Sequence, residues 1–313
     1  MPWALPWDYG FSIVFNPMLS LARVLIWLLS LLPLWLLHAL AVPLAGVLSF
    51  RDRRKARVVA TNLKIAFPEL NKQDRQALVR SNRIEMVRLV LETGAVWYWP
   101  EKRLKKHVRS VQGLDVLHQA VAEGNGVLLV GAHLGNWEIL TLSASLEVPL
   151  VALYRAPEHP GWQQAITDSR QRFGGELVAS GGPAMRKLLR QLRDGKTAGI
   201  LVDQQPKQGD GEFAPFFGRP ALTMTLPYRL VQKTGCRLVF IDCIRLDNGK
   251  GWTMHYRAAP DAVYDDNQAV ALSAMNQSLT KSIRQHPSQY LWRYKRFARQ
   301  PDGVASPYER KPV

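Results

Sequence analysis

The chain alternates between short, largely apolar runs and longer segments in which apolar residues recur every three or four positions. Such runs are typical of buried strands, and the longer period is typical of helices. The strand-like segments are residues 126–130, 149–154, 176–180, 197–203, 237–244 and 252–258. The helix-like segments are residues 71–94, about 136 onward, 162–173, 183–195 and 268–285. This order predicts one α/β domain with a mixed, largely parallel central sheet flanked by helices.

Punctuating residues predict where some of these helices begin and end. Asn71 can cap the first helix with Asp74 in its first turn, and Gly94 is expected to end it. Pro183 and Gly195 bound a later helix in the same way. Two stretches are expected to be long loops, which often hold functional residues: "APEHPGW" (156–162) and "QQPKQGDGEFAPF" (204–216).

The N-terminal part contains an apolar run, residues 24–50, with no Asp, Glu, Lys or Arg in its 27 positions. This length predicts a membrane-anchoring, spanning helix, although Pro33 and Pro43 would kink it or divide it in two. The basic segment 51–57 follows, and the positive-inside bias places it and the rest of the chain in the cytoplasm. We therefore expect an anchor with its basic flank at residues 1–57 and an α/β domain at 58–313. A buried helical hairpin in a soluble protein is the alternative.

Charge and cysteine content narrow the choice of partners. The chain has 41 Lys and Arg against 25 Asp and Glu, a net charge of +16, which indicates an anionic partner: nucleic acid, anionic lipid, or an acidic or phosphorylated substrate. No nucleic-acid-binding module is recognisable, so no nucleic-acid partner is expected. Cys236 and Cys243 do not have the spacing of a zinc site and are expected to be small buried residues.

The stretch "GAHLGNWE" (131–138) carries the candidate chemistry. His133 follows a buried strand, Asn136 can cap the next helix, and Glu138 falls in the first turn of that helix. A tight turn would let the Glu138 carboxylate reach one imidazole nitrogen, which leaves the other nitrogen free to take a proton. Such a pair can deprotonate a hydroxyl that attacks an activated acyl group. A helix-capping turn with a solvated Glu138 is the structural alternative.

The surrounding residues limit the reaction type. No serine or cysteine accompanies the pair, which favours direct acyl transfer over a covalent acyl-enzyme. One histidine with one glutamate does not hold zinc, so neither a metal nor another cofactor is expected.

Seven collinear stretches resemble the late acyltransferases of lipid A biosynthesis, the lauroyl/myristoyl transferase family of Gram-negative bacteria. They are "ATNLKIAFPEL" (60–70), "ETGAVWYWP" (92–100), "GVLLVGAHLGNWE" (126–138), "YRAPEHP" (154–160), "LVDQQP" (201–206), "FFGRPALT" (216–223) and "SQYLWRYKRF" (288–297). The resemblance covers nearly the whole chain and implies a glycerolipid-acyltransferase-like fold.

The resemblance also implies a reaction and a set of site residues. The reaction is transfer of a fatty acyl chain from acyl carrier protein to a hydroxyl of a lipid A precursor, at the cytoplasmic face of the bacterial inner membrane. His133 would be the general base and Glu138 its orienting partner. The expected substrate-binding residues are Asn136, Arg155, Asp203, Gly218 and Arg219. An internal ion pair is the alternative role for Arg155 and Asp203.

Two departures from the family pattern concern the acceptor. Many members read "WxHRRF" where this chain has "WRYKRF" (292–297), and the "DYGP" type of sequence after Asp203 is absent. Another glycolipid or a lysophospholipid therefore stays open as acceptor, although the "FPEGTRS"-like block of the glycerolipid acyltransferases is missing. A non-catalytic, membrane-tethered basic binding protein is the rival from another class.

Overall fold

A seven-stranded sheet forms the centre of the molecule. The computed structural model describes residues 17–49, 53–157, 160–207 and 209–309. The strand order is β1-β9-β8-β2-β5-β3-β4, and all neighbouring strands are parallel except the antiparallel pair β8 and β9. The strands are β1 (Val108–Gln112), β2 (Val127–Gly131), β3 (Leu150–Tyr154), β4 (Glu176–Ala179), β5 (Thr197–Leu201), β8 (Arg237–Arg245) and β9 (Trp252–Ala258). The expected mixed, largely parallel sheet is confirmed.

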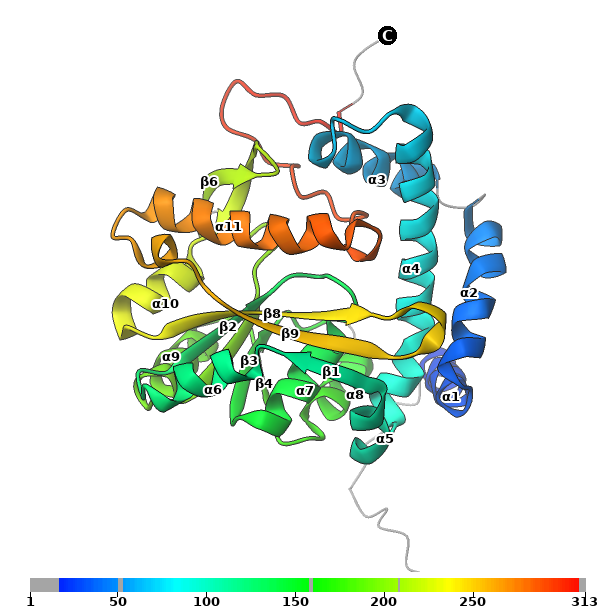
Figure 1. Cartoon of the computed structure of the whole chain (residues 1–313), viewed down its shortest axis with the longest axis horizontal. Helices are drawn as coiled ribbons and strands as arrows, with labels where there is room; N and C mark the ends of the chain where they lie inside the picture. The colour runs from blue at the N-terminus through cyan, green and yellow to red at the C-terminus, as the bar shows by residue number, and fades with distance from the viewer. Residues whose placement is uncertain (1–16, 50–52, 158–159, 208, 310–313) are drawn as a thin grey trace, which may run out of the picture.

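Helices cover both faces of this sheet (Figure 1). They are α1 (Pro17–Leu31), α2 (Leu34–Ser49), α3 (Arg53–Ala66), α4 (Lys72–Tyr98), α5 (Glu101–His107), α6 (Leu114–Ala122), α7 (Glu138–Glu147), α8 (Pro160–Gln171), α9 (Gly182–Arg193), α10 (Leu226–Thr234) and α11 (Gln268–Gln285). Three short 3₁₀ helices are η1 (Asp247–Gly249), η2 (Asp261–Tyr264) and η3 (Pro287–Gln289).

The alternation of side chains along β2 divides the apolar core into two layers. Leu128 and Val130 pack with side chains of α9, α10 and α11 on one face of the sheet. Val127 and Leu129 pack with side chains of α6 and α7 on the other face. Because both faces are covered, a central strand needs apolar residues at every position, which explains the unbroken apolar run.

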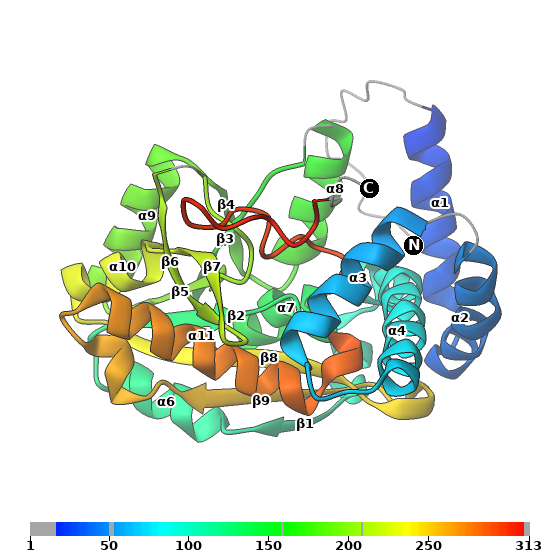
Figure 2. The ribbon, with the colours of Figure 1, turned by 90° about the horizontal axis from the view of Figure 1, so that it is seen from above.

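The long helix α4 lies beside the sheet, and α1 and α2 pack against its outer side (Figures 1 and 2). Its start agrees with expectation, since Asn71 caps it by accepting a hydrogen bond from the backbone N–H of Asp74 at 2.9 Å. Its end does not, because the helix continues past Gly94 to Tyr98. A Cβ at Gly94 would overlap the backbone of α1 near Ile26. This glycine permits close helix packing and does not end the helix.

The N-terminal apolar run forms two helices, α1 and α2, separated at Pro33. Within the described residues, no helix is both long and apolar enough to cross a membrane, so the expected spanning helix is not supported. Pro33 fits the alternative of a divided run, since proline disfavours helical geometry in the residue before it. Residues 1–16 and 50–52 of the expected anchor lie outside the described part.

One expected loop, residues 204–216, contains the first strand of a second, two-stranded sheet. Strand β6 (Gly211–Phe216) pairs with the antiparallel β7 (Arg219–Met224). Phe217 and Gly218 join them with positive φ angles of 51° and 73°. Two consecutive positive φ angles are typical of the tight hairpin turn that glycine favours at its second position.

Candidate active site

The candidate site lies where two adjacent parallel strands end. Strand β2 pairs with β5 so that Gly131 lies opposite Leu201. His133 and Asp203 each follow two residues later, so the register places them side by side at the carboxyl edge of the sheet. Ligands of open α/β sheets commonly bind at this edge.

His133 is held by Asp203 through both its ring and its backbone. The ring nitrogen Nδ1 lies 2.7 Å from Asp203 Oδ1, and the backbone N–H donates to Oδ2 at 3.2 Å. The hydroxyl of the buried Tyr290 also hydrogen-bonds to this carboxylate. Burial alone would raise the pKa of the Asp203 carboxyl, but the charge of His133 and these hydrogen bonds outweigh burial and hold the pKa below its ordinary value. An ionised Asp203 accepts a hydrogen bond from Nδ1–H, so in the neutral imidazole the proton lies on Nδ1 and Nε2 is the nitrogen that can accept.

Glu138 does not make the hydrogen bond expected from the sequence. Its carboxylate accepts two hydrogen bonds from the Arg170 guanidinium of α8, at 2.8 and 2.6 Å. Burial raises the pKa of the Glu138 carboxyl, but the Arg170 charge and hydrogen bonds outweigh it, and the pKa is lowered. The expected His133–Glu138 pair is thus replaced, within the described structure, by a His133–Asp203 pair beside a Glu138–Arg170 pair.

The backbone amides of the turn after β2 are already engaged. The N–H of Leu134 donates to the Ala132 carbonyl, that of Gly135 to the Gln289 carbonyl, and that of Asn136 to the Cys243 carbonyl, at 2.8, 3.1 and 2.8 Å. Gly135 has φ +63°, and a Cβ there would overlap the carbonyl oxygen of Cys243. The turn is therefore fixed tightly against β8 and the segment that follows α11.

A buried ionic cluster supports this turn from behind. Asn136 is 0% exposed, and its side-chain amide donates to Glu92 of α4 at 2.8 Å. Glu92 also accepts two hydrogen bonds from Arg245, at 2.7 and 2.8 Å, and one from His38 of α2 at 2.7 Å. Burial opposes the charge of Glu92, but Arg245 and His38 lower the pKa of its carboxyl to about 2. Asn136 thus links α2 and α4 to the turn after β2.

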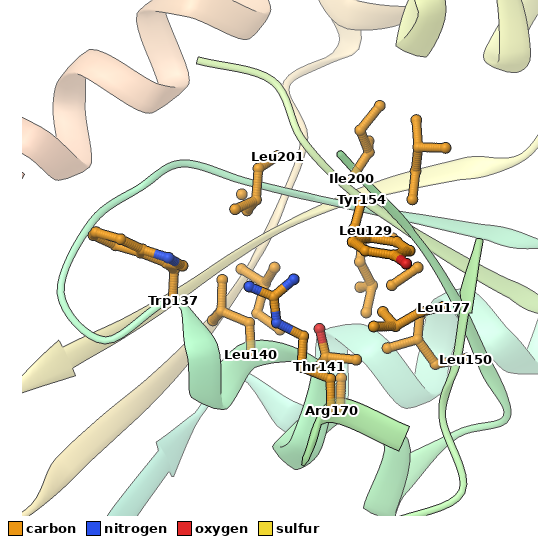
Figure 3. A pocket seen from close by; sticks show the side chains of 16 residues that line it. Leu129, Trp137, Leu140, Thr141, Leu150, Tyr154, Arg170, Leu177, Ile200 and Leu201 are labelled. Carbon is orange, nitrogen blue, oxygen red and sulfur yellow. The ribbon is translucent and has the colours of Figure 1, made fainter. Parts of the chain in front are cut away.

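An apolar pocket opens beside His133. The Trp137 ring lies edge-on to the His133 ring, with 5.1 Å between their centroids, and Trp137 also lines the pocket. Figure 3 shows apolar side chains between Trp137 on one side and Leu150 and Leu177 on the other, with Arg170 beside them. The pocket lies between the sheet and helix α7.

The sequence profile of the bacterial lipid A biosynthesis acyltransferase family matches residues 12–299. The chain belongs to this family.

Individual relatives agree with this assignment. The chain is 27% identical over 285 residues to the lipid A biosynthesis palmitoleoyltransferase of Escherichia coli, covering 90% of this chain and 92% of that protein. The lipid A biosynthesis lauroyltransferase of the same organism gives the same identity and coverage. A phosphatidylinositol mannoside acyltransferase of Mycobacterium tuberculosis is 28% identical over 188 residues, 58% of each chain. The protein is an acyltransferase.

The remaining expected site residues of this acyltransferase are dispersed. Arg155 follows β3 at the same sheet edge and is exposed, with no ion pair inside the described part of the chain. Arg155 and Asp203 therefore do not form the internal pair that was the alternative. Gly218 is in the β6–β7 turn, and Arg219 donates to Gln300 and to the Ala305 carbonyl at 3.2 and 3.4 Å. The buried position of Asn136 gives it no access to a substrate.

Several residues at the site were missed by the sequence analysis. Arg170 lies 37 positions from His133 and belongs to none of the seven stretches. Tyr290 lies 157 positions from His133, within the stretch 288–297, but no role was expected for it. Gln204 lies next to Asp203, and its side-chain nitrogen is 3.2 Å from His133 Nε2. One available signal was the parallel placement of "GAH" and "VDQ" after two apolar strands, which predicts adjacent ends when those strands pair.

Proposed function

We propose that this chain transfers a fatty acyl group from the thioester of acyl carrier protein to a hydroxyl of a lipid A precursor. The observation that carries the proposal is His133, which is tethered through Nδ1 to the buried Asp203 and contacts the ring of Trp137, a residue that lines an apolar pocket. Family membership and the names of the E. coli relatives support the acceptor.

The reaction follows from the state of the imidazole. Nε2 accepts the proton of the acceptor hydroxyl while its oxygen attacks the thioester carbonyl. Asp203 stabilises the imidazolium that forms, as a buried carboxylate does in other hydrolases and transferases. The tetrahedral intermediate then loses the thiolate, which takes the proton from Nε2. Glu138 and Arg170 support the wall of the pocket and do not exchange a proton in this scheme.

Apolar side chains on α1 and α2 support contact with a membrane surface. Among the described residues, eighteen large apolar side chains are exposed, and twelve of them lie on these two helices. They are Leu21, Val24, Leu25, Trp27, Leu28, Leu31, Trp35, Leu40, Val42, Leu44, Val47 and Leu48. An apolar patch of this kind marks a protein or membrane interaction site. The basic residues at the start of α3 follow directly and suit the anionic cytoplasmic leaflet.

The test combines a lipid analysis with an assay of purified protein. Mass spectrometry of lipid A from cells with and without the gene should show one acyl chain fewer in its absence. In a vesicle assay with acyl carrier protein thioester, His133→Ala should lower the turnover rate by at least about 10³-fold, because the variant lacks the general base. Full activity of this variant would contradict the proposed chemistry.

A second acceptor class has its own support. The mycobacterial relative is named for phosphatidylinositol mannoside, a glycolipid without a lipid A core. The same vesicle assay with a glycolipid or lysophospholipid acceptor separates the two. A higher kcat/KM with either acceptor than with the lipid A precursor would replace that part of the proposal.

A further inference from the structure

Acyl transfer creates a negative charge that the turn at residues 133–136 cannot stabilise with its backbone. When the hydroxyl oxygen attacks, the thioester carbonyl becomes an oxyanion, and enzymes hold such oxyanions with preorganised N–H donors. The four backbone N–H groups of this turn already donate to Asp203 and to the carbonyls of Ala132, Gln289 and Cys243. This turn therefore has no free backbone donor, and a nearby side chain can supply one.

Gln204 is the side-chain donor nearest to the reacting nitrogen. Its Nε2 lies 3.2 Å from Nε2 of His133. Because Nδ1–H donates to Asp203, Nε2 of the neutral ring can only accept, so the amide presents its NH₂ group to the ring. In the resting enzyme, this amide occupies the place that the acceptor hydroxyl must take.

The backbone on both sides of Gln204 is fixed, while its amide is anchored only at the ring. Asp203 is held by His133 and Tyr290. The backbone N–H of Gln205 donates to the Tyr294 hydroxyl at 2.9 Å. The Gln205 side chain donates to the carbonyls of Lys295 and Arg296 at 2.7 and 3.0 Å. The Gln204 side chain is partly exposed and has only the His133 bond among those found in the described residues.

We propose that Gln204 is the oxyanion donor: its amide leaves His133 Nε2 when the acceptor hydroxyl binds there, and then donates to the carbonyl oxygen of the thioester. This inference rests on the proposed acyl transfer. The acceptor O–H proton passes to Nε2, the new C–O bond forms, and the carbonyl electron pair moves onto the oxygen beside the Gln204 N–H. As the C–S bond breaks, the pair returns to the carbonyl and the thiolate takes the proton from Nε2.

The experiment compares Gln204→Met with the wild type and with the matched variant Gln205→Met. Methionine keeps the length of the side chain and removes the N–H donor. Gln204→Met should lower kcat by about 10²- to 10³-fold, the usual effect of losing one oxyanion donor, with KM for the acceptor nearly unchanged. Binding of a donor analogue with a methylene in place of the carbonyl should be unchanged, because that analogue has no oxygen to stabilise. Gln205→Met removes an amide of the same size that faces residues 295 and 296.

Each outcome decides the inference separately from the proposed function. Wild type that transfers no acyl group from the thioester would overturn the proposed function itself. With active wild type, a Gln204→Met variant within fivefold of wild-type kcat overturns the role of Gln204. Equal losses in both glutamine variants, accompanied by equal losses of thermal stability, do the same and indicate a structural role. A third variant, Arg155→Met, covers the exposed cation at the same sheet edge. If this variant loses kcat and Gln204→Met does not, Arg155 and not Gln204 stabilises the oxyanion.

Discussion

Replacing Asp203 by asparagine tests which carboxylate orients His133. The Asp203 carboxylate accepts from His133 Nδ1, from the His133 backbone N–H and from Tyr290. An amide has one acceptor atom, so it cannot satisfy all three donors. If its NH₂ faces the ring, the imidazole must carry its proton on Nε2 and can no longer accept the substrate proton. If its NH₂ faces the backbone N–H, two donors oppose each other in a side chain that is 2% exposed.

The loss of kcat in the first arrangement and the loss of stability in the second can both be estimated. The wrong tautomer lowers kcat by about 10⁴-fold in the serine protease triad, where the same Asp→Asn change was made, so we expect about 10³- to 10⁴-fold here. That range corresponds to about 4 to 5.5 kcal/mol of transition-state stabilisation. The opposed donors would cost about 1 to 3 kcal/mol of folding stability. Initial rates with acyl carrier protein thioester give kcat, and thermal unfolding gives the stability.

Glu138→Gln is the matched control because it removes the same charge from the other carboxylate near His133. It weakens the ion pair with Arg170, whose side chain is 20% exposed, and leaves Asp203 on the ring. We expect kcat within about tenfold of wild type, since partly exposed pairs contribute little. The reasoning is refuted if Glu138→Gln is as inactive as His133→Ala while Asp203→Asn stays within tenfold of wild type.

Three further changes test other parts of the structure. Gly135→Ala places a Cβ against the Cys243 carbonyl at a positive φ angle, so we expect a loss of at least about 1 to 3 kcal/mol in stability together with reduced kcat; an unchanged melting temperature and rate would contradict the tight turn. Because the pKa of Glu92 is lowered to about 2 from 4.5, its contribution to stability is complete above pH 4.5 and is lost as the pH falls toward 2, which urea unfolding against pH measures. Glu92→Gln should lack this dependence and be less stable at pH 7, since the buried Arg245 loses one of its two carboxylate partners and keeps only Glu85. Gly199→Val adds methyl groups to the pocket wall near Leu150, so a mixture of acyl donors should give products with shorter chains, the preference for the shorter donor rising about fourfold for each methylene excluded. An unchanged product distribution would show that the acyl chain lies elsewhere.

The sequence predicted the central strands of the sheet better than the edge strand β1 and the β6–β7 hairpin. The runs of β2, β3, β5 and β8 are recognisable because a strand covered on both faces is apolar at most of its positions. Strand β1 was not predicted, since four of its five residues are exposed and it lies at the edge of the sheet. The β6–β7 hairpin was hidden because its glycines and prolines resemble a loop, although Phe217 and Gly218 form a tight turn within it.

The site was predicted only in part, because its partners come from distant elements. His133 was identified by its position after a strand, which is a local feature. The partner of its Nδ1 depends on which strand lies beside β2, and sequence order does not reveal that β5 occupies this place. Glu138 was favoured because it is close in sequence, yet Arg170, 32 positions later, takes that carboxylate.

The Glu138–Arg170 pair explains why one carboxylate and not two orients the imidazole. Glu138 is close enough to His133 for the histidine charge to help lower its pKa. A second unpaired carboxylate there would compete with Asp203 for the ring protons and would repel the oxyanion that forms beside Nε2. The two hydrogen bonds from the Arg170 guanidinium compensate the charge of Glu138 and hold this side chain of α7 against α8. Asp203 is thus left as the single uncompensated negative charge bonded to the ring, and that condition keeps Nδ1 protonated and Nε2 available to the acceptor.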